Sequence, residues 1–435
     1  MPVRLPSALI VSRTRLGGLA LALALLISSA LPSGAWATNG YFSNGYGAKS
    51  EGAGGTGIAW AQDALAAAAN PAGTAEVGNR IDLGLDWFIP RRGAQIEGNA
   101  FGASASYDGS AKANFFIPSF GYTKRISDTL AAGVAVFGNG GMDTLYNSNP
   151  YARFGASGPA GVELEQLFIT PSVSWKVAPG QNLGLGVNLA YQRFLAQGIG
   201  FFGGFSGAPN NVSDLGVDTS YGAGLRLGWS GTIAPGLTAG ATWASRIRGN
   251  FSKYKGLFAD GGRFDVPDNF GLGLVFAPSA QWKIAADWQR INYAHVASVG
   301  DPLAALLRGV PLGASNGPGF GWQNINVFKL GASFALDPAW TVRAGYSHAG
   351  QAVPASQTFF NILAPGVVSD HFTLGGSWAP NARGEWSAFF AYAPEKTVNG
   401  NASIPPGYPP GGFGGGEANV HLKEAILGVS YAWKL

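Results

Sequence analysis

The last twelve residues of the chain alternate between two kinds of side chain. One parity is apolar and carries aromatics near its end: Ala425, Leu427, Val429, Tyr431, Trp433 and Leu435. The other parity is mostly small or polar, as at Glu424, Gly428, Ser430 and Lys434. Successive side chains of a strand point to opposite faces. The pattern therefore predicts a strand with lipid on one side and a filled or wet interior on the other.

The same alternation recurs in about fourteen segments, an even number that suits a closed antiparallel transmembrane barrel. They begin near residues 80, 113, 129, 163, 181, 216, 236, 266, 280, 323, 339, 368, 384 and 418. Tight turns such as 178–181 and 337–339 alternate with long connections such as 198–215 and 294–322. Closure is required because an open sheet edge in lipid leaves backbone groups unpaired. A soluble β-sandwich explains neither the terminal alternation nor the aromatics at strand ends.

Composition supports an all-β membrane protein over a helical one. Only 12% of the 435 residues are charged and 67 are glycine, whereas globular chains carry about 25% charged residues. Mean hydropathy is only +0.11, which is too low for a bundle of transmembrane helices. There is no cysteine, which excludes disulfides and cysteine-bound metals.

The first 37 residues have the three parts of a secretory signal peptide. A basic stretch (residues 1–15) precedes an apolar run (16–31), and Ala35-Trp36-Ala37 forms a cleavage site. A membrane anchor helix is the alternative, but the apolar run is short for a span of about 20 residues. The basic excess of 28 lysines and arginines over 24 acids includes three arginines of this leader. The remainder carries a net charge of about +1 without a basic stripe, so no nucleic-acid partner is expected.

After the leader, residues 38–78 are rich in glycine and alanine and do not alternate. We interpret them as a plug and residues 79–435 as the barrel. The plug contains an ordered set of motifs: Thr38-Asn39-Gly40-Tyr41-Phe42, Asn44-Gly45-Tyr46-Gly47, Gly52-Ala53-Gly54-Gly55 and Asn70-Pro71-Ala72-Gly73. In these motifs, and again at Pro267–Gly271 and Trp322–Tyr346, the mature chain resembles the FadL/TodX family of outer-membrane transporters for long-chain fatty acids and hydrocarbons.

The resemblance implies a fourteen-stranded barrel with an N-terminal hatch in its lumen. It also implies a route: capture in an apolar groove of the extracellular loops, an internal pocket, and lateral release beside a kink in the third strand. The hatch residues that match the family are Thr38, Asn39, Gly40, Asn70, Pro71 and Ala72. By chain order the third strand is about 129–141, and its kink is expected at Gly138, Asn139, Gly140 and Gly141, because glycine bends and weakens strands.

Two long loops carry apolar side chains that are expected to form the capture groove. These are Ile199, Phe201, Phe202, Phe205, Tyr254, Leu257 and Phe258. Large apolar patches on exposed loops mark binding sites. The alternative is that the side chains pack on each other or dip into lipopolysaccharide. A third loop contains Leu303–Leu307, which suggests a short helix over the mouth.

Strand parity places five basic side chains on the inward face: Lys329, Arg343, His371, Arg226 and Arg246. A carboxylate ligand in an apolar pocket would need such a partner. The alternative, which we favour slightly, is that they pair internally with acids such as Asp82, Asp86 and Asp287 or with the hatch, as buried charges usually do.

No motif for catalysis or cofactor binding stands out. The four histidines lack metal-ligand spacing, and the glycine motif at 52–57 does not follow a strand as a dinucleotide-binding loop would. We therefore expect no enzyme, cofactor or metal. The predicted function is uptake of fatty acids or hydrocarbons by an outer-membrane protein of a Gram-negative cell, in contact with membrane lipid and lipopolysaccharide and favoured as a monomer. The alternatives are a general porin for polar solutes and a structural or adhesive barrel.

Overall fold

One large sheet dominates the computed structural model, which describes residues 39–409 and 412–435. The predicted leader and Thr38 lie outside the described residues. The strands are β1 (Arg80–Glu97), β2 (Ala105–Asp108), β3 (Phe115–Arg125), β4 (Leu130–Tyr146), β5 (Ala160–Ala178), β6 (Gln181–Gln197), β7 (Asp218–Ala234), β8 (Leu237–Ala244), β9 (Asn269–Phe276), β10 (Trp282–Ile291), β11 (Ile325–Ala335), β12 (Trp340–Ala349), β13 (Asp370–Trp378), β14 (Gly384–Val398) and β15 (Glu417–Lys434).

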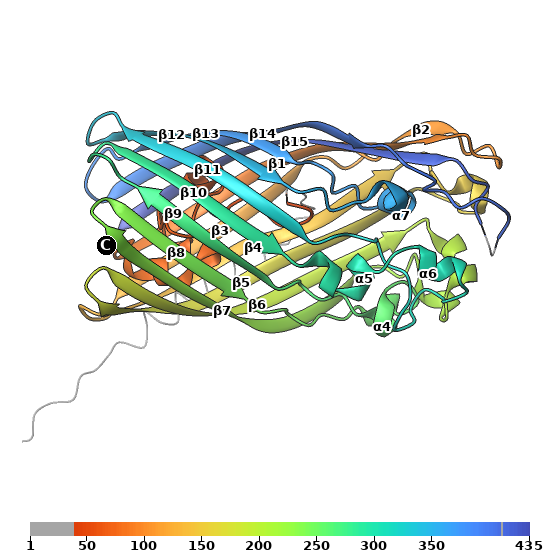
Figure 1. Ribbon diagram of the computed structural model, residues 1–435, viewed down its shortest axis with the longest axis horizontal. Coiled ribbons are helices and arrows are strands. Elements are labelled where there is room, and N and C mark those ends of the chain that lie inside the picture. Colours follow the sequence, from red (N-terminus) through yellow and green to blue (C-terminus); the bar gives the residue numbers. More distant parts are fainter. Residues whose placement is uncertain (1–38, 410–411) are drawn as a thin grey trace, which may run out of the picture. The chain divides into compact units, whose positions relative to one another are not determined.

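The sheet closes on itself. Neighbouring strands are antiparallel, and β15 pairs with β1 from Lys434 opposite Arg80 to Glu417 opposite Glu97 (Figure 1). Both β2 and β3 pair with β1, so the strands fill fourteen positions in the wall. The predicted closed barrel of fourteen strands is confirmed.

The second wall position differs from the prediction of one continuous strand beginning near residue 113. It is divided into β2 and β3, with a break between Asp108 and Phe115. At the break the Ser110 hydroxyl accepts a hydrogen bond from the Arg92 amide and donates one to the Arg92 carbonyl oxygen, each at 2.9 Å. The Ser110 side chain thus bonds the backbone groups of Arg92 that a neighbouring strand would otherwise bond. The alternating sequence pattern does not reveal this break in the strand.

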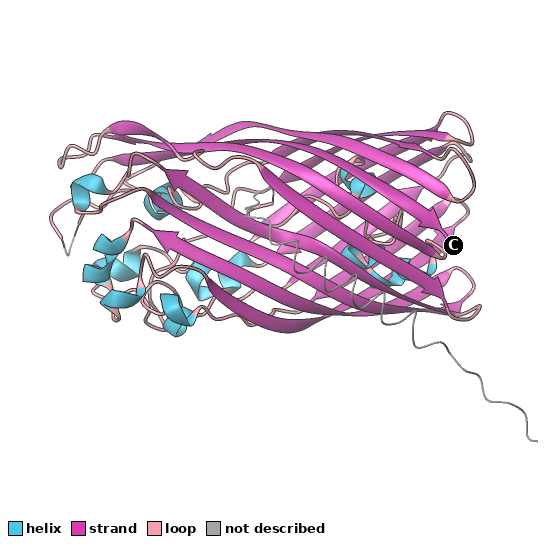
Figure 2. Ribbon diagram, turned by 180° about the vertical axis from the view of Figure 1, so that it is seen from behind, coloured by secondary structure: helices cyan, strands magenta, loops and turns pink. Residues whose placement is uncertain are grey.

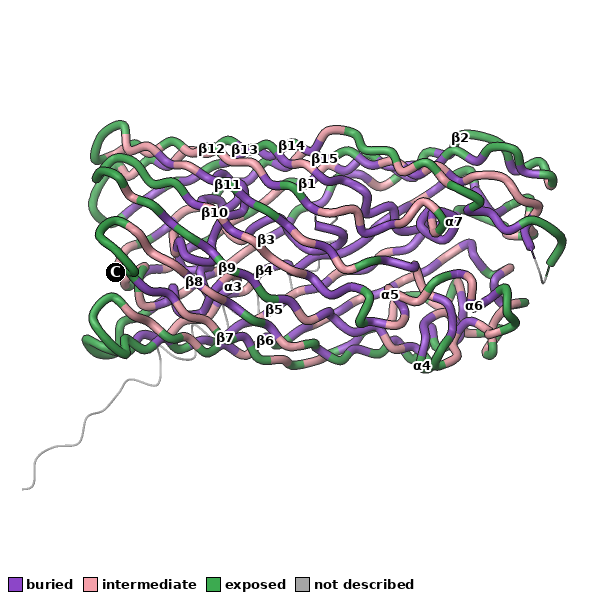
Figure 3. The backbone as a smooth tube through the Cα atoms, in the orientation of Figure 1, coloured by how far each residue is buried: buried purple, intermediate pink, exposed green. Residues whose placement is uncertain are grey.

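Burial follows the predicted alternation along the strands (Figure 3). In β15, Leu427, Val429 and Trp433 are exposed, whereas Glu424 is buried. Exposed tryptophans also gather at the strand ends beside the short turns, where Trp340 of β12 stacks on Trp378 of β13 with ring centroids 5.9 Å apart. An apolar outer band with aromatic side chains at its rim is typical of a barrel wall in a bilayer.

The long connections gather at the end of the barrel opposite the C-terminus and carry short helices (Figure 2). The α-helices there are α4 (Ala259–Gly262), α5 (Ala297–Gly300), α6 (Ala304–Leu307) and α7 (Thr358–Asn361), and the 3-10 helices are η2 (Ala152–Phe154), η3 (Gly200–Phe205), η4 (Pro209–Asn211), η5 (Ser252–Tyr254), η6 (Tyr293–His295) and η7 (Ala355–Gln357). The helix expected within 303–307 is confirmed as α6. None of the helices in the described part of the chain is long and apolar enough to span a membrane.

Residues 39–78, here called the N-terminal segment, lie against the inward-facing side chains of the wall. The segment contains α2 (Ala48–Glu51), α3 (Ala66–Ala69) and η1 (Pro71–Ala75). Wall carboxylates hold its amides: Asp287 accepts hydrogen bonds from Gly57 and Ile58 at 2.8 and 3.0 Å, and Asp82 accepts one from Ala64 at 3.0 Å. Polar wall groups therefore find partners in the segment.

The segment touches the wall backbone directly where a strand carries glycine. A Cβ atom added at Gly345 of β12 would lie 2.0 Å from the Gly54 nitrogen and 2.3 Å from the Ala53 carbonyl carbon. Only a residue without a side chain permits this approach. Some of the glycine in this chain therefore makes room for the N-terminal segment.

Replacing Gly345 with alanine is expected to displace the N-terminal segment, because backbone atoms cannot yield as a flexible side chain does. Overpacking costs about 1–3 kcal/mol, so the purified variant should unfold at a lower temperature and be cleaved faster within residues 39–78. The matched control is Gly376→Ala on neighbouring β13, whose added Cβ would meet nothing closer than 3.8 Å. Equal melting and proteolysis of the two variants would contradict the tight contact.

Candidate functional site

An apolar pocket of about 40 Å³ lies among the long connections. Its lining comes from two strand ends and four loops: Val162, Phe194, Ile199, Phe202, Leu257, Phe258, Ser298, Leu312, Pro318, Gly319, Phe320, Phe360 and Leu363. The one polar side chain, Ser298, is already bonded, since its hydroxyl donates to the Arg263 carbonyl oxygen at 2.5 Å and accepts from the Ala259 amide at 3.0 Å. The pocket therefore offers a ligand apolar surface and no unpaired side-chain donor.

The structure brings four of the seven predicted groove residues into this lining: Ile199, Phe202, Leu257 and Phe258. Phe201 and Phe205 lie beside it, half-buried against other aromatic rings. Tyr254 is fully buried and does not line the pocket, and its hydroxyl donates to the Gly216 carbonyl oxygen at 2.7 Å.

Sequence reasoning missed the contributions of the connections after β10 and β12. Leu312 and Phe320 come from the first, and Phe360 and Leu363 from the second. The adjacent pair Phe359-Phe360 in a loop was the available signal. Chain order did not reveal that four loops meet at one pocket.

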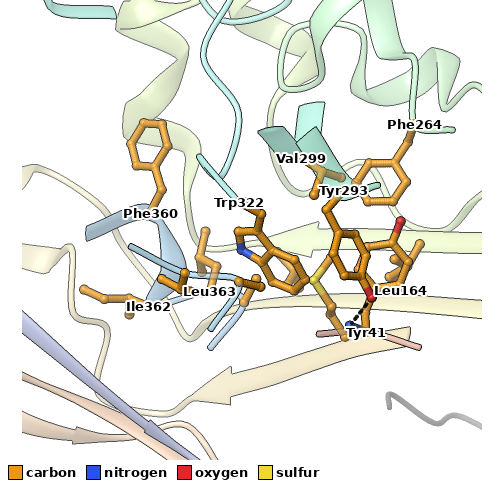
Figure 4. Close-up of a cluster of buried hydrophobic side chains, with 14 of the residues drawn as sticks. Tyr41, Leu164, Phe264, Tyr293, Val299, Trp322, Phe360, Ile362 and Leu363 are labelled. Atoms are coloured by element: carbon orange, nitrogen blue, oxygen red, sulfur yellow. Dashed lines mark hydrogen bonds between the residues drawn. The ribbon is translucent and has the colours of Figure 1, made fainter. Parts of the chain in front are cut away.

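Beneath the pocket an aromatic cluster leads to the N-terminal segment (Figure 4). The ring of Phe258, which lines the pocket, is 4.9 Å from that of Phe264, and Phe264 is 6.2 Å from Tyr41. Tyr41 also contacts Tyr293 and Trp322, with centroids 4.9 and 5.7 Å apart. Rings thus follow one another from the pocket to the start of the N-terminal segment.

Tyr41, Phe42 and Ser43 pair with the edge of β4. Phe42 forms an antiparallel bridge with Gly140, the Ser43 amide donates to the Asn139 carbonyl oxygen, and the Gly141 amide donates to the Tyr41 carbonyl oxygen, both at 2.9 Å. A Cβ atom at Gly140 would lie 1.7 Å from the Tyr41 oxygen, so this pairing requires glycine there. The register between β4 and β5 also shifts between Gly138 and Gly140. All four residues of the expected kink therefore lie at an irregular part of the third wall position.

The wall is unpaired beside this irregularity. Ladder pairing of β3 with β4 runs only from Arg125 opposite Ala131 to Phe120 opposite Val136. Among the described residues, 112–119 and 137–144 share no ladder, and pairing resumes where the Leu145 amide donates to the Gly109 carbonyl oxygen at 3.0 Å. We call these two runs the unpaired stretch. A cavity of about 20 Å³ adjoins it, lined partly by Ser43 and by Ile117 of β3.

The Asn-Pro-Ala motif fastens the other end of the N-terminal segment. The Asn70 amide nitrogen donates to the carbonyl oxygens of Ile58 at 2.7 Å and Trp229 of β7 at 2.9 Å, while its side-chain oxygen accepts from the Ala72 amide at 3.0 Å. Pro71 begins η1, and the Ala72 carbonyl oxygen accepts from Ser174 of β5 at 2.7 Å. Of the matched hatch residues, Asn39 and Gly40 lie instead near Tyr293 and Trp322.

Four of the five predicted inward cations have polar partners in the lumen. Lys329 donates to the carbonyl oxygens of Asn44 and Gly55 at 2.6 and 3.3 Å. Arg226 donates to the Ala69 carbonyl oxygen at 3.1 Å, and Arg343 to the Gln62 side chain at 3.1 Å. His371 Nε2 lies 3.4 Å from Glu424 Oε2.

The structure places Arg246, the fifth of these side chains, outside the strands. This residue follows the end of β8 and is exposed, with a guanidinium nitrogen 3.9 Å from a carboxylate oxygen of Asp265. The strand parity used to place it no longer applied, because β8 ends at Ala244.

Glu51 of the N-terminal segment is a buried carboxyl group. Its Oε1 accepts a hydrogen bond from the Gly45 amide at 2.9 Å. Burial raises the pKa of Glu51 to about 7, against the opposing effects of the Gly45 amide and the Lys329 charge.

The barrel end with the short turns has a different character. A hollow of about 540 Å³ lies between η1 and the turns, and its lining includes Glu76, Arg125, Asp128, Lys176 and Asn182. This mouth is polar and charged, in contrast to the pocket at the opposite end.

Comparison with solved structures finds the same fold in proteins of low sequence identity. The P. putida toluene transporter TodX is 17% identical, with a TM-score of 0.64 over 90% of this chain and 99% of that chain. A Pseudomonas aeruginosa FadL homologue is 15% identical, with a TM-score of 0.69 over 91% and 99%. The Ralstonia pickettii toluene transporter TbuX is 18% identical, with a TM-score of 0.63 over 90% and 98%. A comparison with curated protein sequences gave no match.

The family profile described as "Outer membrane protein transport protein (OMPP1/FadL/TodX)" matches residues 24–432, which is nearly the whole chain. The chain belongs to the OMPP1/FadL/TodX family of outer-membrane transport proteins.

Proposed function

We propose that this protein takes up hydrophobic small molecules passively across the outer membrane, with the N-terminal segment acting as a hatch. The observation that carries the proposal is the unbroken series of contacts from the apolar pocket, through the Phe264–Tyr41–Trp322 rings, to Tyr41–Ser43 on the edge of β4. The proposed function includes no chemical step, and a single chain supplies every part of the path.

Capture is favourable because the pocket removes apolar surface from water. Burial stabilises by roughly 25 cal/mol per Å², and the pocket lining presents no competing unpaired polar side chain. The ligand would then move between the rings below, which the side chains permit only by shifting, because the cluster is packed.

Release through the wall is supported by a comparison of the residues at the two exits from the lumen, the short-turn end of the barrel and the wall beside the unpaired stretch. The hollow at the short-turn end is lined by charged residues such as Arg125, Asp128 and Lys176. The wall beside the middle of the unpaired stretch instead carries buried Phe88, Phe115 and Ile117, and the charged side chains of Lys112 and Asp143 lie at one end of it. A hydrophobic molecule that leaves through the wall reaches lipid without crossing water.

A hatch movement is required because Tyr41–Ser43 occupies the inner side of the β4 edge. A ligand that displaces Tyr41 from the rings of Tyr293 and Trp322 would pull directly on the hydrogen bonds that residues 41–43 make to β4. The Asn70 end is held by several bonds to the hatch and wall. We therefore propose that the first residues of the hatch move and the Asn-Pro-Ala end anchors it.

A neutral hydrocarbon fits the site better than an ionised fatty acid. The lumen cations Lys329, Arg226 and Arg343 already donate to hatch groups, and the pocket lining contains no charged residue. An unpaired carboxylate in such surroundings is costly. TodX and TbuX are named as toluene transporters, which agrees with a neutral cargo. A fatty acid remains the second candidate within the family's range.

A general porin differs in needing no hatch. Deletion of residues 38–73 distinguishes the two, since a porin would conduct polar solutes about equally with and without them. A structural or adhesive barrel would show no uptake phenotype at all.

Uptake in a deletion strain tests the proposal directly. We expect the strain to lose most accumulation of labelled toluene and of an alkane at limiting concentration, and a plasmid copy to restore it. Oleate tests the second candidate in the same assay. Normal accumulation of all three cargoes would remove the transport assignment.

Substitution of Phe202 by aspartate should impair capture, because it removes a buried ring and puts a charge in the pocket. Loss of such a side chain costs about 1.5–3 kcal/mol, which is roughly a tenfold to hundredfold weaker apparent affinity for cargo in transport. Leu307→Asp is the control, since Leu307 is 41% exposed on nearby α6 and does not line the pocket. Equal uptake by the two variants would count against the pocket.

The Glu51 carboxyl predicts that the hatch loosens as pH rises. Because its pKa is raised from 4.5 to about 7 in the folded chain, the folded state binds more protons than the unfolded one between these values, and this group's contribution to stability falls with rising pH in that window. Hydrogen exchange of residues 40–57, corrected for intrinsic rates, should accelerate between pH 5 and 8 more in the wild type than in Glu51→Gln. Identical pH dependence in both proteins would exclude Glu51 as the cause.

A further inference from the structure

A chain of ionic groups crosses the extracellular limit of the unpaired stretch. Arg92 reaches from β1 to β4, where its Nε donates to the Asp143 carbonyl oxygen and its Nη2 to Asp143 Oδ1, both at 2.6 Å. The same Nη2 donates to the Lys112 carbonyl oxygen at 2.8 Å. One guanidinium thus ties β1, the break after β2 and β4 together.

The network continues along the wall. Lys112 Nζ lies 2.6 Å from Glu163 Oε2 on β5 and 3.5 Å from Asp143 Oδ2, and Arg193 on β6 bonds both Glu163 and Glu165. Three cations face three carboxylates, so charge balances. We call Arg92, Lys112 and Asp143 the clamp.

The clamp lies at a place in the wall where the backbone ladder between β3 and β4 is absent. Residues 112–119 and 137–144 share no ladder hydrogen bonds among the described residues, and backbone pairing resumes only at the amides of Ala111 and Leu145. Arg92 and Asp143 are 3% and 7% exposed. Replacing a buried ion pair with apolar side chains is often neutral or stabilising, so its presence suggests a role other than stability.

We infer that the Arg92–Asp143 pair fixes the extracellular limit of the unpaired stretch and thereby sets the largest cargo that leaves through the wall. The inference rests on the proposed lateral release. At its opposite limit the stretch ends at a regular ladder, Phe120 opposite Val136. The extracellular end of the stretch is held by the clamp side chains in addition to two backbone hydrogen bonds. Substitution of these side chains can therefore lengthen the unpaired stretch at this end.

The test removes both charges together, as Arg92→Met/Asp143→Leu, because removing one would leave the other buried and unpaired. Folding is checked first by heat-dependent mobility on gels. Uptake of toluene, naphthalene and pyrene is then compared in the deletion strain. We expect pyrene uptake relative to toluene to rise at least tenfold, with toluene uptake changing less than twofold. An unchanged size profile in the folded variant would overturn the inference.

Two further variants test the inference even if the double variant does not fold. Lys112→Met removes a half-buried member of the clamp, so it should fold even if the double variant does not, and should shift the size profile in the same direction. Lys423→Met/Glu395→Leu is the control, because it removes an exposed ion pair between β15 and β14, where the ladder is present on both sides of the pair. A shift in this control equal to that of the clamp variants would also overturn the inference.

Hydrogen exchange of the purified proteins separates this inference from the proposed function. The amides of Ala111 and Leu145 should exchange at least tenfold faster in the clamp variants than in the wild type, whatever is transported. Uptake of no cargo by the wild type would refute the proposed function. Unaltered exchange at these amides would refute the clamp.

Discussion

Backbone amide and carbonyl groups within a bilayer need hydrogen-bond partners, because hydrocarbon supplies none. The closed ladder from β1 to β15 meets this need around almost the entire wall. Within the described residues, one gap in this ladder lies between β3 and β4, where it stops at Phe120 and Val136. There the N-terminal segment supplies partners from inside through Tyr41 and Ser43, and the Arg92 side chain supplies others. The ladder can therefore be interrupted here without leaving all backbone groups of the strand edge unpaired.

The same need explains the contents of the lumen. Inward-facing Lys329, Arg226 and Asp287 would be costly in an empty apolar interior, but each bonds a backbone group of the N-terminal segment. The segment and the wall satisfy each other, so displacing one part of the segment has consequences for both. The polar partners lie away from the apolar pocket, which stays free of charged side chains.

Most of the wall was predictable from sequence, because period-two alternation directly reports which face of a strand meets lipid. The predicted strand starts near 181 and 384 agree with β6 and β14. The break after Asp108 was not predictable, since it depends on the Ser110 hydroxyl bonding the backbone of Arg92. Arg246 lies past the end of β8, where strand parity no longer fixes the direction of a side chain.

The site was less accessible to sequence reasoning than the wall. Apolar residues on the loops pointed to Phe202 and Phe258, but the meeting of four loops at one pocket depends on tertiary packing. Whether a lumen cation serves a ligand or the protein also depends on contacts between residues far apart in the chain, as between Lys329 and Asn44. The clamp joins residues from three separate parts of the wall, and no local pattern marks it.

If residues 41–43 must leave the edge of β4 for cargo to pass, a reversible cross-link between the two should block uptake. The chain has no cysteine, so Ser43→Cys/Asn139→Cys introduces a single pair across the bridge of Phe42 with Gly140. Opposed residues of antiparallel strands lie close enough for a disulfide. The control, Ser377→Cys/Ser387→Cys, joins opposed residues of β13 and β14 and leaves the N-terminal segment unlinked. Oxidation is expected to abolish hydrocarbon uptake only in the first variant, and reduction is expected to restore it. Full uptake by the oxidised Ser43–Asn139 variant, with the disulfide verified by mass spectrometry, would contradict this requirement.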